Sequence, residues 1–200
     1  MGHPPVVLAS TSPFRRELLT RLGIAFETAA PGSDETERPN ETPRSLVLRL
    51  AESKARAVAA KHPSSLIIGS DQVAVIDGEI LVKPGDRSQA RRQLEMASGR
   101  LVTFYTGLCL LNSSTGRSQS SCEPYRVRFR RLSAEQIEGY IDRERPFDCA
   151  GSFKSEGLGI ALFDRMEGED PTSLVGLPLI RLVEMLQQEG LDVLTSVSDG

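Results

Sequence analysis

Tryptophan is absent from this 200-residue sequence, and cysteine and histidine are scarce. The three cysteines, Cys109, Cys122 and Cys149, are odd in number and form no CxxC pair, which argues against a disulfide framework and a thiolate zinc site. The two histidines, His3 and His62, do not favour a Ser-His-Asp triad or a histidine metal cage. We therefore expect the chain to reside in the reducing cytoplasm.

The sequence also lacks an excess of charge of one sign and any long apolar run. Because 24 Lys and Arg residues stand against 27 Asp and Glu residues, for a formal net charge of −3, we expect no nucleic-acid or membrane partner. No apolar run approaches the roughly 18–20 residues of a membrane span. A GxxxxGK[ST] phosphate loop and an HExxH zinc motif are also missing. The net charge does not exclude a small phosphorylated ligand, because the site for such a ligand needs only a local cluster of cations.

Strand and helix signals along the chain predict one α/β domain with a mixed sheet over residues 1–191 and a flexible tail over 192–200. Apolar residues at three- and four-residue spacing predict a helix over residues 43–62, and Asp77-Gly78 predicts a hairpin turn. Ser133 with Gln136 predicts a capping box. The other expected helices begin near residues 13, 86 or 88, and 177. Strands are expected at 6–10, 26–30, 66–69, 73–76, 80–82, 101–111, 125–129 and 160–163.

The segment Ser10–Arg16 joins the first expected strand to the first expected helix. Ser12 is placed to cap this helix and Pro13 to occupy its first position. The free N–H groups of a helix N-terminus attract anions, whereas cations are disfavoured there unless an anion accompanies them. Arg15 and Arg16 are therefore candidates for half of a phosphate site. The alternative is that both arginines solvate an exposed helix face.

Asp71 follows an apolar run and is expected on or just beyond a buried strand, where ligands of open α/β sheets gather. Its carboxylate could hold magnesium or activate a water; a cap or turn role is the alternative. Glu35, in the polar loop at 31–42, could join Asp71 at a metal, because Mg²⁺ prefers carboxylate oxygens. Otherwise Glu35 keeps the loop soluble. Three lysines in unlike settings are individually typical of solvated side chains: Lys54, Lys83 and Lys154.

Six short motifs follow one another along the chain: Leu8–Arg16, Asp34-Glu35, Glu52–Ala55, Gly69–Gln72, Lys83-Pro84 and Gly151–Gly157. Their order and spacing resemble the Maf family of nucleotide pyrophosphatases, from Val6 to about Gly190. The resemblance implies a Maf/ITPase-like α/β fold, with a mixed, twisted sheet in two lobes and a central cleft. A homodimer is a further expectation from the family.

The resemblance also implies hydrolysis of a nucleoside triphosphate to the monophosphate and pyrophosphate, with Mg²⁺ or Mn²⁺. Asp71 falls on the family's general base and Glu35 on its metal-associated carboxylate. Lys154 is a further binding candidate. The family's phosphate-binding positions correspond to Ser10, Arg15, Arg16, Lys54 and Lys83.

Gln72 and Glu156 resemble the 7-methyl-GTP branch of the family rather than the dTTP/UTP branch, which usually has Thr after the catalytic Asp. A 7-methylguanine base is cationic, so an aromatic face can bind it, and a carboxylate can accept hydrogen bonds from its N1–H and amino group. The aromatic position carries Phe14 in place of the expected Trp. Phenylalanine binds a cation on its ring face more weakly than tryptophan does. Phe14 is alternatively a core residue at the helix start.

A nucleotide-sensing regulator is the alternative function. Maf proteins are also described as inhibitors of septum formation, and the same cleft could act in cell division by binding without turnover. Turnover would need a water-activating carboxylate, which a pure sensor would not.

Overall fold

The chain forms six α-helices, two 3₁₀ helices and seven strands over the residues that the structure, a computed structural model, describes: 3–36 and 38–195. The helices are α1 (Pro13–Thr20), α2 (Pro43–Ala59), α3 (Arg87–Ala97), α4 (Ala134–Glu144), α5 (Pro171–Val175) and α6 (Leu179–Gln188), with 3₁₀ helices η1 (Ala150–Ser152) and η2 (Leu158–Leu162). The strands are β1 (Val6–Leu8), β2 (Phe26–Thr28), β3 (Leu66–Ile76), β4 (Glu79–Leu81), β5 (Leu101–Asn112), β6 (Ser118–Phe129) and β7 (Phe163–Glu167).

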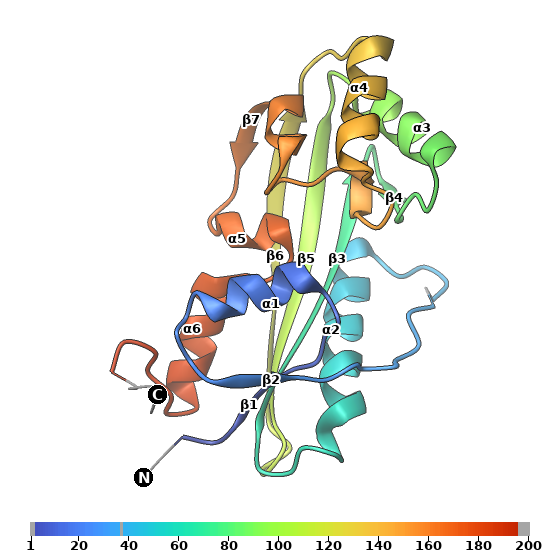
Figure 1. Cartoon of the computed structure of the whole chain (residues 1–200). Helices are drawn as coiled ribbons and strands as arrows, with labels where there is room; N and C mark the ends of the chain where they lie inside the picture. The colour runs from blue at the N-terminus through green and yellow to red at the C-terminus, as the bar shows by residue number, and fades with distance from the viewer. Residues whose placement is uncertain (1–2, 37, 196–200) are drawn as a thin grey trace.

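All seven strands belong to one mixed sheet. The order is β2-β1-β3-β5-β6-β7, and β4 pairs with β3 off this path. β1 runs parallel to β2 and β3, whereas the remaining pairs are antiparallel. The long strands β3, β5 and β6 run through both halves of the molecule, and helices cover each half (Figure 1). The predicted α/β fold with a mixed sheet in two lobes is confirmed.

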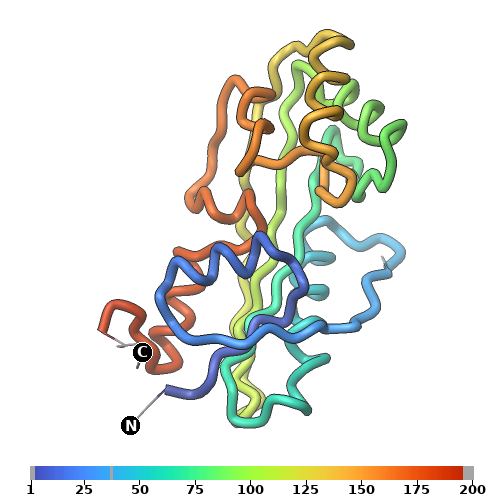
Figure 2. Tube along the Cα trace, viewed as in Figure 1, coloured from blue at the N-terminus to red at the C-terminus, as the bar shows by residue number. Residues whose placement is uncertain are grey.

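In the lower lobe of Figure 1 helices cover both faces of the sheet, and the strand residues Val6–Leu8 are all buried. Leu8 of β1 packs in one apolar cluster with α1 and α6, while the preceding Val7 packs in another with α2. Strands buried on both faces need continuous apolar runs, which is why 6–8 and 66–68 carry no polar residue. Both ends of the described chain lie in this lobe (Figure 2).

The upper lobe is built around aromatic rings. Phe104, Phe129, Phe153 and Phe163 meet edge to face, with ring centroids between 4.9 and 6.1 Å apart. Such T-shaped contacts are a preferred arrangement of aromatic rings. Because Phe153 belongs to the Gly-rich motif, this core anchors the motif at the edge of the upper lobe.

Two glycines let helix α2 rest directly on the sheet. A Cβ atom on Gly69 of β3 would lie 2.0 Å from the carbonyl oxygen of Ala51, and one on Gly107 of β5 would lie 2.2 Å from that of Val47. No other residue fits at either position without displacing the helix backbone. The close contact brings Lys54, one turn after Ala51, against the middle of β3.

Several predicted local signals are confirmed. Ser12 Oγ accepts a hydrogen bond from the first turn of α1, with a proline at the start of the helix. Ser133 and Gln136 form the reciprocal capping box of α4. The hairpin between β3 and β4 turns at Asp77 and Gly78, whose φ angles of 48° and 90° match the left-handed conformation of a tight hairpin turn.

Two strand predictions are wrong. The segments 66–69 and 73–76 belong to one 11-residue strand. Of the two positions expected for Asp71, on or just beyond a buried strand, the first is confirmed: Asp71 lies in the middle of β3, opposite Gly107. Polar residues continue the strand because the ladder to β5 supplies their backbone hydrogen bonds. The run Ile160–Phe163 is mostly the 3₁₀ helix η2, and β7 begins at Phe163. A short apolar run does not by itself distinguish a strand from a helical turn.

The end of the described chain is a short turn at residues 193–195, in which Val193 packs against the lower-lobe core. The rest of the predicted tail, 196–200, lies outside the described residues. In the described part of the chain, no helix has the length and apolar character needed to cross a membrane.

Candidate functional site

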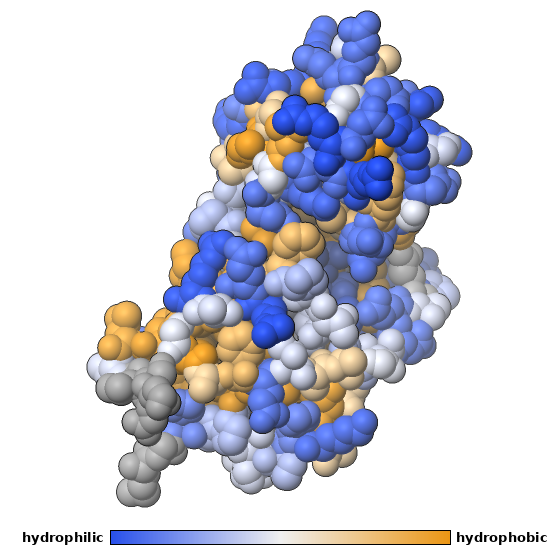
Figure 3. All heavy atoms as spheres, in the orientation of Figure 1, coloured by the Kyte–Doolittle hydropathy of each residue, from blue (hydrophilic) through white to orange (hydrophobic). Residues whose placement is uncertain are grey.

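A cleft of about 790 Å³ lies between the two lobes. The β1–α1 loop, α2, the middle of β3, the β4–α3 connection and the segment after α4 supply its walls. Figure 3 shows the surface hollowed at the waist of the molecule, with both hydrophilic and apolar side chains around the opening. The register explains the opening: β1 ends at Leu8, opposite Ile68, while β3 continues past it. Asp71 lies on the part of β3 that β1 leaves uncovered.

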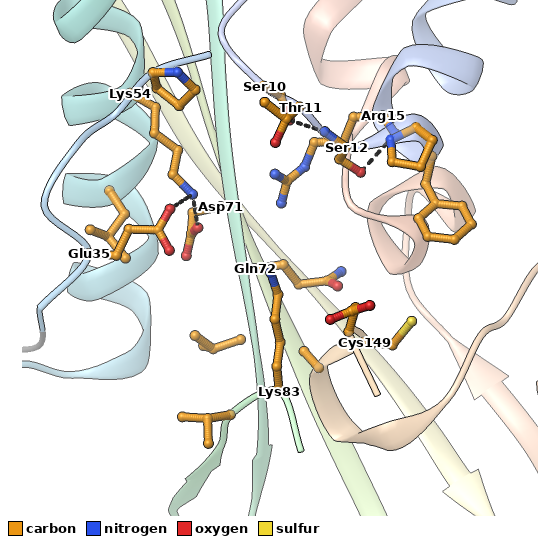
Figure 4. A pocket seen from close by; sticks show the side chains of 18 of the residues that line it. Ser10, Thr11, Ser12, Arg15, Glu35, Lys54, Asp71, Gln72, Lys83 and Cys149 are labelled. Atoms are coloured by element: carbon orange, nitrogen blue, oxygen red, sulfur yellow. Dashed lines mark hydrogen bonds and ion pairs between the residues drawn. The ribbon is translucent and has the colours of Figure 1, made fainter. Parts of the chain in front are cut away.

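Two carboxylates meet one ammonium group inside the cleft (Figure 4). Lys54 Nζ lies 2.6 Å from Asp71 Oδ1 and 2.7 Å from Glu35 Oε1. Lys54 and Asp71 are only 6% and 8% exposed, so each buried charge depends on the other for compensation. The hydrogen bond from Lys54 lowers the pKa of the more exposed Glu35, which is therefore ionised at neutral pH.

Arg15 faces these carboxylates from the other side of the cleft (Figure 4). Its Nε donates a hydrogen bond of 2.8 Å to the carbonyl oxygen of Gly176, which holds the side chain in place. Burial lowers the pKa of Arg15, while the negative charges of Asp71 and Glu35 raise it. The guanidinium stays protonated in any case, because arginine does not deprotonate in proteins. Arg15 therefore directs a permanent positive charge toward Asp71.

The β1–α1 loop is held by its own serines. Ser10 Oγ accepts a hydrogen bond of 3.1 Å from the Ser12 N–H, and Ser12 Oγ accepts one of 3.4 Å from the Arg15 N–H. Ser10 is buried and lines the cleft beside the N-terminus of α1, an end that favours anions. Lys83, from the β4–α3 connection, points into the cleft from the upper lobe (Figure 4). Cations from three separate elements thus converge: Arg15, Lys54 and Lys83.

The three predicted specificity residues surround one recess. A smaller cavity of about 130 Å³ adjoins the cleft, and Phe14, Gln72 and Glu156 all line it. Phe14 and Gln72 also line the main cleft. A ligand that extends from the cleft into this recess would contact all three side chains.

Two predicted binding residues are placed differently from the others. Arg16 lines a second hollow, which shares the β1–α1 loop with the cleft and is also lined by Glu17 and Thr20. Lys154 lines the cleft, but its Nζ donates a hydrogen bond of 2.7 Å to the carbonyl oxygen of Glu144, the last residue of α4. A cation at this position complements the partial negative charge of the helix C-terminus. The ammonium of Lys154 therefore has a structural partner.

Three polar residues of the cleft wall were not predicted. Arg145, Asp148 and Cys149 line the cleft from the segment between α4 and η1. Their only sequence signal is that they directly precede the Gly-rich motif, because they follow no periodicity and belong to no recognised motif. Burial raises the pKa of Cys149 to about 11, so the thiol is protonated at neutral pH and is a poor nucleophile.

Among the carboxylates that line the cleft, Asp71 and Glu35 share Lys54 as a partner and are the candidate metal ligands. Over residues 3–36 and 38–195, no group of three or more His, Cys, Asp or Glu side chains is arranged to hold a metal ion. A carboxylate pair nevertheless suits Mg²⁺, which is commonly held by one or two carboxylates while water and substrate phosphates complete its octahedron. The donor set therefore fits a hard divalent cation that binds together with a phosphorylated ligand.

Comparisons with known proteins give the family and the fold. Residues 5–189 match the family described as Maf-like protein. The chain is 57% identical over 191 residues to a protein from Nitrosococcus oceani named 7-methyl-GTP pyrophosphatase, with 96% of each chain covered. A solved HAM1 protein from Coxiella burnetii matches 92% of this chain and 99% of its own, with a TM-score of 0.50 and 13% identity. At that identity the likeness concerns the fold alone.

Proposed function

The chain belongs to the Maf family, and on that premise we propose that it is a hydrolase of acid anhydrides that converts 7-methyl-GTP to 7-methyl-GMP and pyrophosphate. The observation that carries the proposal is the position of the Asp71 carboxylate, which lies between the cations Lys54 and Arg15 in a cleft large enough for a nucleotide. The 57% identity to a protein named 7-methyl-GTP pyrophosphatase supports the choice of substrate.

Asp71 acts as the general base in the proposed reaction. Its carboxylate orients a water molecule and accepts a proton from it as the water oxygen bonds to the α-phosphorus. The bond between the α-phosphorus and the bridging oxygen to the β-phosphorus breaks, and pyrophosphate leaves. No covalent intermediate with the protein is needed.

Cationic side chains bind the triphosphate and stabilise the charge that builds on the departing pyrophosphate. Arg15, Lys54 and Lys83 point into the cleft from three elements and lie where phosphate oxygens can reach them (Figure 4). Fixed charges of this kind stabilise a transition state because they need no reorganisation during the reaction. Ser10 and the N-terminus of α1 add hydrogen-bond donors on the same side. Arg16 is not among the residues that line the cleft and is therefore left out of this set.

Glu35 and Asp71 are the residues that would hold Mg²⁺ or Mn²⁺, which would neutralise charge on the leaving pyrophosphate. Lys54 pairs with one oxygen of each carboxylate and so holds the two groups close together. The lowered pKa of Glu35 means that this carboxylate is available in its ionised form over the whole neutral range.

The recess beside the cleft receives the base. The Phe14 ring offers a face to the positive charge of 7-methylguanine, and Glu156 offers a carboxylate to its N1–H and amino group. The three free cysteines support a reducing compartment, the cytoplasm, as the place of action.

Release of pyrophosphate from 7-methyl-GTP, GTP, UTP and dTTP, measured side by side with Mg²⁺ and with EDTA, tests the proposal. We expect the highest kcat/KM for 7-methyl-GTP and loss of activity in EDTA. Release from none of the nucleotides with Mg²⁺ or Mn²⁺ would overturn the enzyme proposal and favour a binding-only regulator. A higher kcat/KM for UTP or dTTP would overturn the substrate assignment.

A further inference from the structure

The side-chain amide of Gln72 is held in one orientation by hydrogen bonds to β5 and α5. Its Nε2 donates to Thr106 Oγ1 at 2.9 Å, to the Ser173 carbonyl oxygen at 2.8 Å and to the Leu174 carbonyl oxygen at 3.1 Å. Carbonyl oxygens only accept hydrogen bonds, so an amide oxygen in this position would face two other oxygens. The NH₂ group therefore points toward α5, and the amide oxygen is the atom left for the ligand side.

Thr106 makes this orientation stricter. The residue is fully buried on β5, and its hydroxyl donates a hydrogen bond of 2.8 Å to the same Ser173 carbonyl oxygen. A hydroxyl has one hydrogen, so Thr106 Oγ1 can act only as an acceptor toward Gln72. The hydroxyl and the α5 carbonyl oxygens therefore accept both amide hydrogens of Gln72. A buried network in which each donor has an acceptor holds a single arrangement.

The free oxygen of the amide faces the recess. Figure 4 shows the Gln72 side chain directed away from Asp71, toward the side of the cleft where Ser12 and Cys149 lie. Both of these residues line the smaller cavity, as do Gln72 and Glu156. Gln72 and Glu156 therefore both present hydrogen-bond acceptors to whatever occupies the recess.

We propose that Thr106 is a positioning residue for base selection, which acts through Gln72 by keeping the recess lined with acceptors. The inference rests on the proposed function. The guanine edge offers neighbouring donors, N1–H and the amino group, which match such a wall. A uracil or thymine edge offers one N–H between two carbonyl oxygens, and these oxygens would face Gln72 or Glu156 without a hydrogen. Two acceptors that face each other without a hydrogen disfavour the wrong base more strongly than the mere absence of a hydrogen bond would.

Thr106→Val tests the proposal, because valine keeps the shape of threonine and removes the hydroxyl. We measure the ratio of kcat/KM for 7-methyl-GTP to that for UTP and, by calorimetry, the ratio of the Kd of UMP to the Kd of 7-methyl-GMP. We expect each ratio to fall by about tenfold, the effect of one misplaced hydrogen-bonding group. Thr106→Ser, which keeps the oxygen, restores the ratio. Thr103→Val on the same strand is the matched control and leaves it unchanged.

Dependence on Gln72 separates positioning from general stability. In a Gln72→Ala background, Thr106→Val should cause no further loss of selectivity. A ratio that is unchanged in Thr106→Val, or a further loss without Gln72, would overturn the proposal. If Thr106→Val does not fold, Thr106→Ala provides the same comparison.

The monophosphate measurements keep this inference distinct from the enzyme proposal, because they need no turnover. A preference for 7-methyl-GMP that Thr106→Val abolishes would support positioning even if no triphosphate were hydrolysed. A wild-type protein that binds both monophosphates equally, or neither, would overturn the positioning role, whatever its activity.

Discussion

Replacing Lys54 by methionine removes the charge at the centre of the cleft while keeping a side chain of similar length. Asp71, which is only 8% exposed, then loses its ion-pair partner at 2.6 Å. Glu35 is more exposed, so the loss of its ion pair with Lys54 destabilises the protein less. Removing one partner of a buried ion pair costs roughly 3–5 kcal/mol, and solvent access through an open cleft reduces the expected loss to about 2–3 kcal/mol. Activity should fall as well, because a phosphate-binding cation is lost.

Urea unfolding at pH 7 without added divalent metal measures this loss, and a double-mutant cycle with Asp71→Asn isolates the pair. We expect a coupling energy of at least about 1 kcal/mol, because the double variant no longer buries an unpaired carboxylate. Lys61→Met, at an exposed lysine just after α2, is the control and should change the free energy of unfolding by less than about 0.5 kcal/mol. Additive losses, or a Lys54→Met variant as stable as the wild type, would refute the reasoning.

Two other predictions concern the packing and the charges around this pair. Gly107→Ala should lower the free energy of unfolding by about 3 kcal/mol, the upper part of the range for overpacking, because its Cβ would lie 2.2 Å from the Val47 oxygen. Gly139→Ala on α4, where a Cβ meets nothing within 4 Å, is the control and should raise the free energy of unfolding. Equal changes in the two variants, measured by urea unfolding, would contradict the packing argument. The lowered pKa of Glu35 means that its contribution to stability is complete above its ordinary value of 4.5 and is lost as pH falls through the lower folded-state pKa. The wild type should therefore exceed Glu35→Gln in stability at pH 7, and the difference should shrink as pH falls below 4.5. A difference in urea unfolding that stays constant as pH falls would rule out the pairing with Lys54.

The sequence predicted local features that depend on neighbouring residues. The Ser12 cap, the Ser133 capping box and the Asp77-Gly78 turn are all found, because caps and tight turns are determined by short-range hydrogen bonds and backbone preferences. Chain segments whose structure depends on distant partners were predicted less well. The polar sequence in the middle of β3 is typical of a loop, but pairing with β5 makes it part of a strand. The apolar residues 160–162 form a 3₁₀ helix instead of the expected strand.

The arrangement of the site could be expected only from the family resemblance. Lys54 and Asp71 are 17 residues apart in sequence, and no local pattern predicts that their side chains meet. The contact depends on Gly69 and Gly107, which allow α2 to approach the sheet and which periodicity alone would class as interruptions. Arg15 and Arg16 are neighbours on a helix and so must point in different directions. That Arg15 is the one in the cleft follows from its hydrogen bond to Gly176, which lies 161 residues away.

Asp71→Asn tests the central claim, that Asp71 is the base of a pyrophosphatase, most directly. The variant keeps the size of the side chain and leaves Lys54 paired with Glu35, so the fold should persist. We expect pyrophosphate release from 7-methyl-GTP to fall by at least roughly 10²-fold, the lower end for loss of a general base, while binding of 7-methyl-GMP is largely retained. Asp164→Asn, at an exposed carboxylate on β7, is the control and should release pyrophosphate at the wild-type rate. Near-normal turnover by a folded Asp71→Asn variant would contradict the account.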